Sequence, residues 1–223
     1  APEPDCVASF RTAIRYFVLA TAARRVRSEP SHSSMLVHTT VFVDPQEAMR
    51  VPIETVLKEF RQGLSDEWFV DELRDLWSQE TIRVDAGDFG RETVDFDALH
   101  GHLEEVSSLV DVVVDNGRAE ADKRLRYPRD SVRTLIVVGG NTLSRGLTLE
   151  GLTVSYFLRT TTTYDTLLQM GRWFGYKRFY EDLPRVWMTD DLETRFRVLA
   201  TVEEQIRRDI DRYAKLGKSP AEL

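Results

Sequence analysis

The chain has 223 residues, of which 42% are hydrophobic, and its formal net charge at pH 7 is −7. This length suits one large domain, and the hydrophobic share is sufficient for a buried core. The acidic balance excludes a protein coated in basic surface, although a local basic groove on an acidic protein can still bind nucleic acid. Cys6 is the single cysteine, which excludes an internal disulfide and a cysteine-rich zinc site.

Apolar runs are short throughout the sequence. None approaches the roughly 18 residues that an ordinary membrane span requires, and the acidic first residues differ from a signal peptide. We therefore expect a cytoplasmic, reducing setting and no membrane partner. The chain does not start with Met, and we expect it to be a fragment of a longer protein.

Hydrophobic periodicity and turn residues divide the chain into alternating helices and strands. Helical spacing predicts helices over residues 6–27, 46–62, 66–79, 95–107, 163–174 and 191–216. Apolar and β-branched runs predict strands over residues 34–43, 81–84, 109–114, 134–138, 152–158 and 185–188. This alternation is typical of a mainly parallel sheet with helices on both faces, so we predict a three-layer α/β fold.

Basic residues gather in the last turns of the first predicted helix. Arg24, Arg25 and Arg27 lie where cations stabilise the helix dipole, and we interpret them as a solvated helix end. His38 falls on a predicted buried strand, and we interpret it as a core histidine with its hydrogen bonds satisfied.

The most informative stretch runs from residue 139 to residue 178. A buried strand ends in Gly139-Gly140 and opens into a loop, at the edge where parallel α/β sheets bind their ligands. Gly146 lets a backbone amide of this loop approach a ligand closely. Side chains of the same loop offer hydroxyl, amide and guanidinium donors to phosphate: Asn141, Thr142, Ser144 and Arg145.

A second buried strand leads through four threonines, residues 160–163, to the predicted helix that carries Gly171 and Arg172. One of the threonines is expected to cap this helix. Glycine inside a helix costs about 1 kcal/mol relative to alanine, so Gly171 is expected where another group approaches closely. Arg172 could reach the charge that develops on a transferred phosphate, as an arginine finger does. The alternative is a surface arginine in an ion pair.

Together these parts resemble the last two conserved motifs of superfamily 2 helicases. Residues 145–148, Arg-Gly-Leu-Thr, are similar to an Arg-Gly-Leu/Ile-Asp loop, and Gly171-Arg172 is similar to part of a Gln-x-x-Gly-Arg-x-x-Arg motif. The pattern LSRGLTLEGL followed by QMGRWFGYKR resembles the Z1 domain still more closely. That family is found beside superfamily 2 helicase regions and is described as a candidate endonuclease. The segments FRTAIRYFVLATAARRVR and SMLVHTTVF resemble it too.

The resemblance implies a RecA-like domain organisation, with an N-terminal helix in residues 1–30, a RecA-like core in residues 31–190 and a C-terminal helix in residues 191–223. It implies that Arg172 is the arginine finger and that Arg178 is a candidate for a second phosphate contact.

The remaining roles that the resemblance implies concern the loop and the helix start. Nucleotide-binding residues would be Gly146, Thr148 and Gln169, and nucleic-acid-binding residues would be Thr142, Ser144 and Arg145. This sequence departs from the helicase pattern in three places. Thr148 replaces the acidic residue, Leu168 stands at the glutamine position, and Gly175 stands at the second arginine position.

The function that the resemblance implies is the C-terminal RecA-like lobe of a DNA-dependent ATPase, a translocase or helicase, acting in DNA restriction or phage defence. Its expected partners are DNA, an N-terminal RecA-like lobe of the same full-length chain and defence proteins. ATP and Mg²⁺ would be held mainly by that other lobe, because Gly217-Lys218-Ser219 lacks the rest of a phosphate-binding loop. The isolated chain is therefore expected to bind no cofactor and to hydrolyse no ATP.

Two alternatives stay open: an endonuclease whose metal site is not visible as a motif, and a non-catalytic RecA-like interaction domain. A common metal-dependent nuclease core needs Asp/Glu-x-Lys to hold Mg²⁺ and position water. None of the lysines in this sequence has an acidic residue two positions before it. His100 and His102 fall in a predicted helix, where side chains two residues apart diverge, so no metal site is predicted from them.

Overall fold

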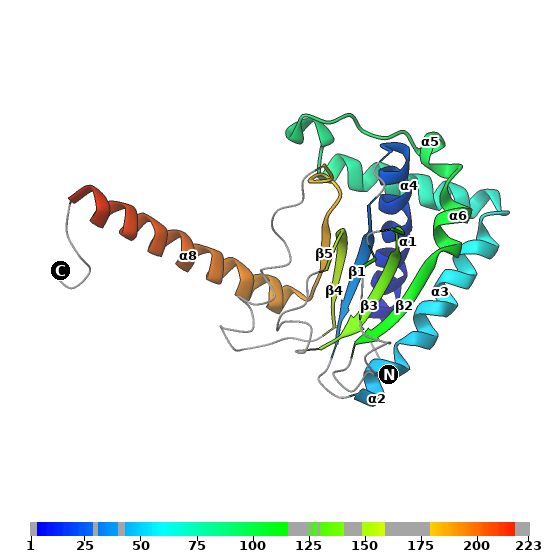
Figure 1. The fold of residues 1–223 in the computed structure, drawn as a ribbon, viewed down its shortest axis with the longest axis horizontal. Coiled ribbons are helices and arrows are strands. Elements are labelled where there is room, and N and C mark those ends of the chain that lie inside the picture. Colours follow the sequence, from blue (N-terminus) through cyan, green and yellow to red (C-terminus); the bar gives the residue numbers. More distant parts are fainter. Residues whose placement is uncertain are drawn as a thin grey trace.

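Five strands form one parallel sheet in the computed structural model, in the order β2-β3-β1-β4-β5 (Figure 1). The strands are β1 Ser33–His38, β2 Val110–Asp115, β3 Thr134–Gly139, β4 Leu152–Phe157 and β5 Arg185–Trp187. The structure describes residues 4–28, 31–39, 43–115, 125, 127–128, 130–140, 149–158 and 179–216. The predicted parallel α/β architecture is confirmed.

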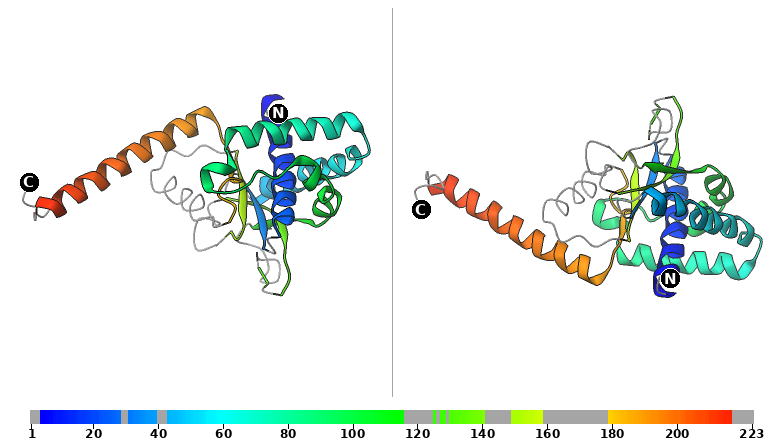
Figure 2. Two further views of the ribbon diagram at one scale, coloured as in Figure 1. Left: turned by 90° about the horizontal axis from the view of Figure 1, so that it is seen from above. Right: turned by 90° about the horizontal axis from the view of Figure 1, so that it is seen from below.

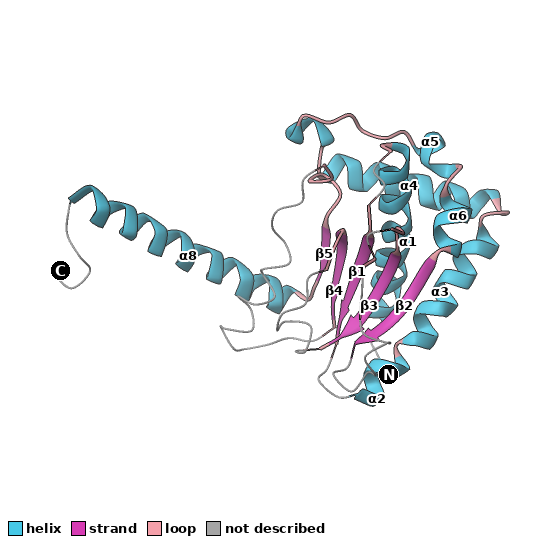
Figure 3. Cartoon of the chain, in the orientation of Figure 1, coloured by secondary structure: helices cyan, strands magenta, loops and turns pink. Residues whose placement is uncertain are grey.

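Helices flank this sheet (Figure 3). They are α1 Pro4–Val26, α2 Val43–Ala48, α3 Arg50–Gly63, α4 Glu67–Arg83, α5 Phe96–His100, α6 Leu103–Ser108 and α8 Asp190–Leu216, with a 3₁₀ turn at Ala86–Phe89. The helix predicted over residues 163–174 lies outside the described residues.

Two sequence predictions of helix and strand boundaries fail in an instructive way. The strand predicted over residues 81–84 is wrong, because the chain continues as the last turn of α4 and the Val84 amide donates to the Glu80 carbonyl. Thr81 turns its hydroxyl back onto the Trp77 carbonyl, 3.0 Å away, and Ile82 stays exposed. The helix predicted over residues 95–107 is divided into α5 and α6 at Gly101. Short β-branched runs at a helix end therefore do not distinguish strand from helix.

The first helix, α1, is buried between the sheet and the other helices of its face (Figure 2). Every residue from Tyr16 to Arg24 is buried, so this helix has no polar face over that stretch. It runs antiparallel to the strands. Near its start, the Ser9 hydroxyl lies 2.8 Å from the Tyr156 hydroxyl of β4, and near its end Arg24 donates to Ser33 at the start of β1. The end of α1 thus lies at the amino edge of the sheet.

The opposite face of the sheet packs against the beginning of α8. Leu192 and Leu199 of this helix join a second apolar cluster with Leu36, Leu135 and other strand residues. Beyond Leu199 the helix extends away from the body (Figure 1), and ion pairs four residues apart line it, such as Glu203–Arg207 at 3.7 Å. Such pairs stabilise a helix locally. The sheet is therefore covered by helices on both faces, as predicted.

Candidate functional site

The carboxyl edge of the sheet contains the switch point, which is the place where the strand order reverses. The chain that leaves β1 goes to β2 at one side of the sheet, whereas the chain that leaves β4 goes to β5 at the other side. Strands β1 and β4 are neighbours. In open parallel sheets, ligands bind in the crevice outside the carboxyl ends of two such strands. This edge is therefore the candidate functional site.

The residues that carry the family resemblance follow β3 and β4, and we call residues 140–148 and 159–178 the two signature segments. The strands that lead into them end at this edge, on either side of β1. His38, the last residue of β1, is in register with Gly139 of β3 and with Phe157 of β4. The Thr39 amide donates to the Gly139 carbonyl at 3.0 Å, and the Leu158 amide donates to the His38 carbonyl at 2.9 Å. Since adjacent strands lie about 4.8 Å apart, the two segments start roughly 10 Å from each other.

The residues that the sequence predicts for the site itself follow these starting points. They are Thr142, Ser144, Arg145, Gly146, Thr148, Gln169, Arg172 and Arg178, and all of them lie outside the described residues. The structure thus places the ends of the strands that precede them, and their assigned roles stay predictions.

His38 has a position that its sequence context did not reveal. Its side chain is buried, in agreement with the interpretation as a core histidine, and its ring centroid lies 5.4 Å from that of Phe157. However, it ends the central strand, and its backbone bonds to the start of the second signature segment. A histidine at a switch point can be recognised only when the strand order is known, so sequence reasoning missed this placement.

The amino edge carries buried charges. Arg185 at the start of β5 donates from Nε to Glu80 Oε2 and from Nη2 to the Glu80 carbonyl, both at 2.6 Å. Its Nη1 donates to the carbonyls of Asp182 and Pro184, each at 2.9 Å. The side chains of Arg185 and Glu80 are both 7% exposed, so the pair is held out of water.

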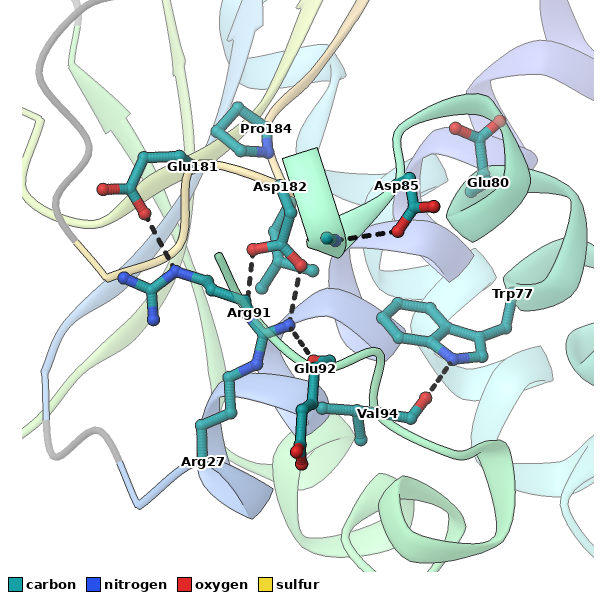
Figure 4. Close-up of polar contacts among 12 residues, drawn as sticks. Arg27, Trp77, Glu80, Asp85, Arg91, Glu92, Val94, Glu181, Asp182 and Pro184 are labelled. Atoms are coloured by element: carbon teal, nitrogen blue, oxygen red, sulfur yellow. Dashed lines mark hydrogen bonds and ion pairs between the residues drawn. The ribbon is translucent and has the colours of Figure 1, made fainter. Parts of the chain in front are cut away.

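A second ion pair joins the end of α1 to the turn before β5. Arg27 forms a fork with Asp182, with Nη1 to Oδ1 at 2.8 Å and Nη2 to Oδ2 at 2.7 Å, and it also donates to the Glu92 carbonyl at 3.1 Å (Figure 4). Arg24 donates to the His32 carbonyl at 2.7 Å, and its guanidinium lies 4.0 Å from the centre of the Tyr180 ring. The interpretation as a solvated helix end is therefore wrong for Arg24 and Arg27, because residues far away in the sequence cover this end of α1.

Two uncharged side chains also donate hydrogen bonds at the amino edge. The Tyr16 hydroxyl donates to the Leu183 carbonyl at 2.8 Å, and Trp77 Nε1 donates to the Val94 carbonyl at 2.8 Å. Burial raises the pKa of Tyr16 well above its ordinary value, although the charge of Arg185 opposes the rise. Tyr16 therefore stays protonated and keeps its role as a donor at neutral pH.

In the part of the chain that the structure describes, no three His, Cys, Asp or Glu side chains are grouped so as to hold a metal ion. Likewise, none of the helices seen there is both long enough and apolar enough to cross a bilayer.

Fold and strand order define a parallel α/β protein whose candidate ligand-binding edge is the carboxyl edge of the sheet. Residues 9–223 match the Z1 domain, and the chain therefore belongs to the Z1 domain family. No curated protein and no solved structure matches it.

Proposed function

We propose that this chain is the C-terminal RecA-like lobe of a DNA-dependent ATPase, a translocase or helicase that acts in DNA restriction or phage defence. The observation that supports the proposal is that the strand ends from which both signature segments start lie at the carboxyl edge, where Gly139 and Leu158 are hydrogen-bonded to Thr39 and His38 at the end of β1. Phosphate ligands of parallel α/β sheets bind at such an edge.

In this proposal the two segments have different tasks. Gly146, Thr148 and Gln169 contact the nucleotide, and the group Thr142, Ser144 and Arg145 contacts the DNA backbone. Arg172 approaches the γ-phosphate of ATP and neutralises the charge that develops there. A second, N-terminal lobe supplies the phosphate-binding loop and Mg²⁺, and ATP lies between the two lobes. The isolated lobe then hydrolyses no ATP.

Arg172 is the better of the two arginine candidates. Gly171-Arg172 matches the Gly-Arg pair of the helicase motif, whereas Gly175 stands at the second arginine position of that motif. We therefore rank Arg172 ahead of Arg178.

The test is DNA-stimulated ATP hydrolysis by the full-length protein. An arginine finger contributes roughly 10³–10⁵ to kcat, so Arg172→Ala should abolish most of the turnover. Arg178→Ala is the matched control, and its kcat should fall by less than about tenfold. Thermal unfolding checks that both variants are folded. A wild-type kcat for Arg172→Ala contradicts the proposal, as does an absence of ATP turnover in the wild type. Metal-dependent cleavage of plasmid DNA without ATP turnover would support the endonuclease alternative instead.

A further inference from the structure

Four apolar residues of α8 are exposed at intervals of four positions, and we call them the α8 stripe: Val198, Val202, Ile206 and Ile210. Their exposed fractions are 60%, 42%, 48% and 56%. At 3.6 residues per turn, positions four apart are about 40° from each other around the helix, so the stripe spans an arc of roughly 120°. Leu199, which packs against the sheet, falls within the same arc. The face of α8 that covers the sheet therefore continues as the stripe where the helix extends away from the body (Figure 1 and Figure 2).

The opposite side of α8 is polar, and its charges pair within the helix. Glu193 pairs with Arg197 at 2.7 Å, and Glu204 pairs with Arg208. Thr201, which is also exposed, donates to the Arg197 carbonyl at 3.0 Å. Most of the stability of such an amphipathic helix comes from packing of its apolar face, and an apolar patch rimmed by polar residues marks an interaction site. We therefore expect another surface to cover the stripe.

We propose that the stripe is covered by a second copy of this chain, with the two α8 helices antiparallel and the two Ile206 side chains at the centre. A two-fold axis at this point sets Val202 of each copy against Ile210 of the other, so apolar side chains meet along the stripe. The body of each copy then lies near the C-terminal end of the other copy's helix. Leu192 and Leu199 keep their places on the sheet of their own copy.

Charge complementarity on the two flanks of the stripe favours this antiparallel arrangement. On one flank, Glu203 and Arg207 pair within a copy at 3.7 Å, and their side chains are 41% and 79% exposed. The two-fold axis brings the same flank of both helices together, so Glu203 of each copy lies beside Arg207 of the other. On the other flank, Gln205 donates to Asp209 of its own helix at 3.3 Å and lies beside Asp209 of the second copy. Opposite charges thus meet on the first flank, and a donor meets an acceptor on the second.

The first test is sedimentation equilibrium of the full-length protein between about 1 and 100 µM. A contact of a few helical turns is smaller than a standard protein interface, so we expect a dimer with a dissociation constant on the order of micromolar. Ile206→Glu sets two carboxylates against each other in the apolar centre and should raise this constant about 100-fold or more. Thr201→Glu is the matched control, because it adds the same charge on the opposite side of α8, and it should change the constant by less than about threefold.

The second test distinguishes a second copy from any other partner. Glu203→Arg and Arg207→Glu each set like charges against each other in a dimer of one variant, so each alone should weaken association about five- to tenfold. In an equimolar mixture of the two variants, each charge meets its opposite again. Association in the mixture should therefore return to within about threefold of the wild type. A mixture that associates no more strongly than its components overturns the antiparallel pairing.

Thermal unfolding checks that every variant is folded, and it also identifies the rival explanation. A wild type that stays monomeric at about 100 µM overturns the inference, as does a dimer that Ile206→Glu leaves intact. A monomeric wild type whose unfolding temperature falls in Ile206→Glu but not in Thr201→Glu also overturns it, since another segment of the same chain would then cover the stripe. Because these measurements follow association alone, the result does not depend on the proposed ATPase function.

Discussion

The two edges of the sheet differ in how their chemistry is encoded. At the carboxyl edge, the predicted phosphate-binding groups are close together in the sequence and form a recognisable signature. At the amino edge, the groups that meet are far apart, as in the pair Arg27–Asp182, which is separated by 155 positions. Local patterns therefore allow a ligand-binding edge to be predicted from sequence, whereas a supporting edge becomes visible only when the chain is folded.

If the amino edge is the supporting edge, breaking its most buried ion pair should cause the largest loss of stability. Glu80→Ala leaves the Arg185 guanidinium buried without its carboxylate, and this typically costs about 3–5 kcal/mol. The measurement is the free energy of unfolding from urea denaturation. The double variant Glu80→Leu with Arg185→Met is the control and should lose less, since no charge stays buried. A loss below about 1 kcal/mol in Glu80→Ala would show that water reaches this pair.

A smaller loss of stability is expected from a substitution at Gly151, where the chain turns tightly into β4 at the same edge. Gly151 has φ +65°, and a Cβ added there would lie 1.7 Å from the His32 carbonyl oxygen. Gly151→Ala should therefore lower the free energy of unfolding by about 2 kcal/mol or more. Gly101→Ala is the matched control, because no atom lies within 4 Å of its added Cβ, and its effect should stay within about 1 kcal/mol. Equal losses in the two variants would contradict the close contact with His32.

The last prediction concerns the contribution of Tyr127 to the free energy of unfolding at alkaline pH. Burial raises the pKa of Tyr127 to about 12 from 10.0, while the hydrogen bond with Ser34 opposes the rise. The protonated phenol is favoured in the folded state, so its contribution to stability is complete below pH 10 and is lost as the pH rises from 10 through 12. Tyr127→Phe should flatten this part of the dependence of unfolding free energy on pH.

Ultraviolet absorbance of the phenolate follows the tyrosine ionisation directly. The variant should lack one late-titrating tyrosine, whereas Tyr16, whose pKa is also raised, still titrates late in both proteins. An alkaline dependence identical to that of the wild type would rule out Tyr127 as its source.

Much of the sheet could be predicted because buried parallel strands are continuous apolar runs. The run over residues 134–138 corresponds to β3, Thr134–Gly139, and that over residues 109–114 corresponds to β2, Val110–Asp115. The run at residues 81–84 misled because Thr81 and Ile82 favour strands in isolation, but the helix preceding them continues. The helix break at Gly101 agrees with the low helix propensity of glycine, which hydrophobic periodicity does not take into account.

Less of the site could be predicted. Strand ends are predictable, and they correctly bring the starts of both signature segments to one edge. The burial of Arg24 and Arg27 could not be predicted, because arginines at a helix end are usually solvated and the residues that cover them come more than 150 positions later. The position of His38 at the switch point likewise depends on strand order, which composition and spacing do not determine.

The burial of α1 has a consequence for how the protein is made. This helix leaves the ribosome before the sheet that covers it, because the Leu183 carbonyl that accepts the Tyr16 hydroxyl follows 167 residues later. At about 5–20 residues per second, translation takes roughly 10–30 s to cover that interval. Throughout this time an apolar helix has no completed sheet to cover it. Newly made chains should therefore need chaperones until residues 180–185 emerge and the two ends of the domain can meet.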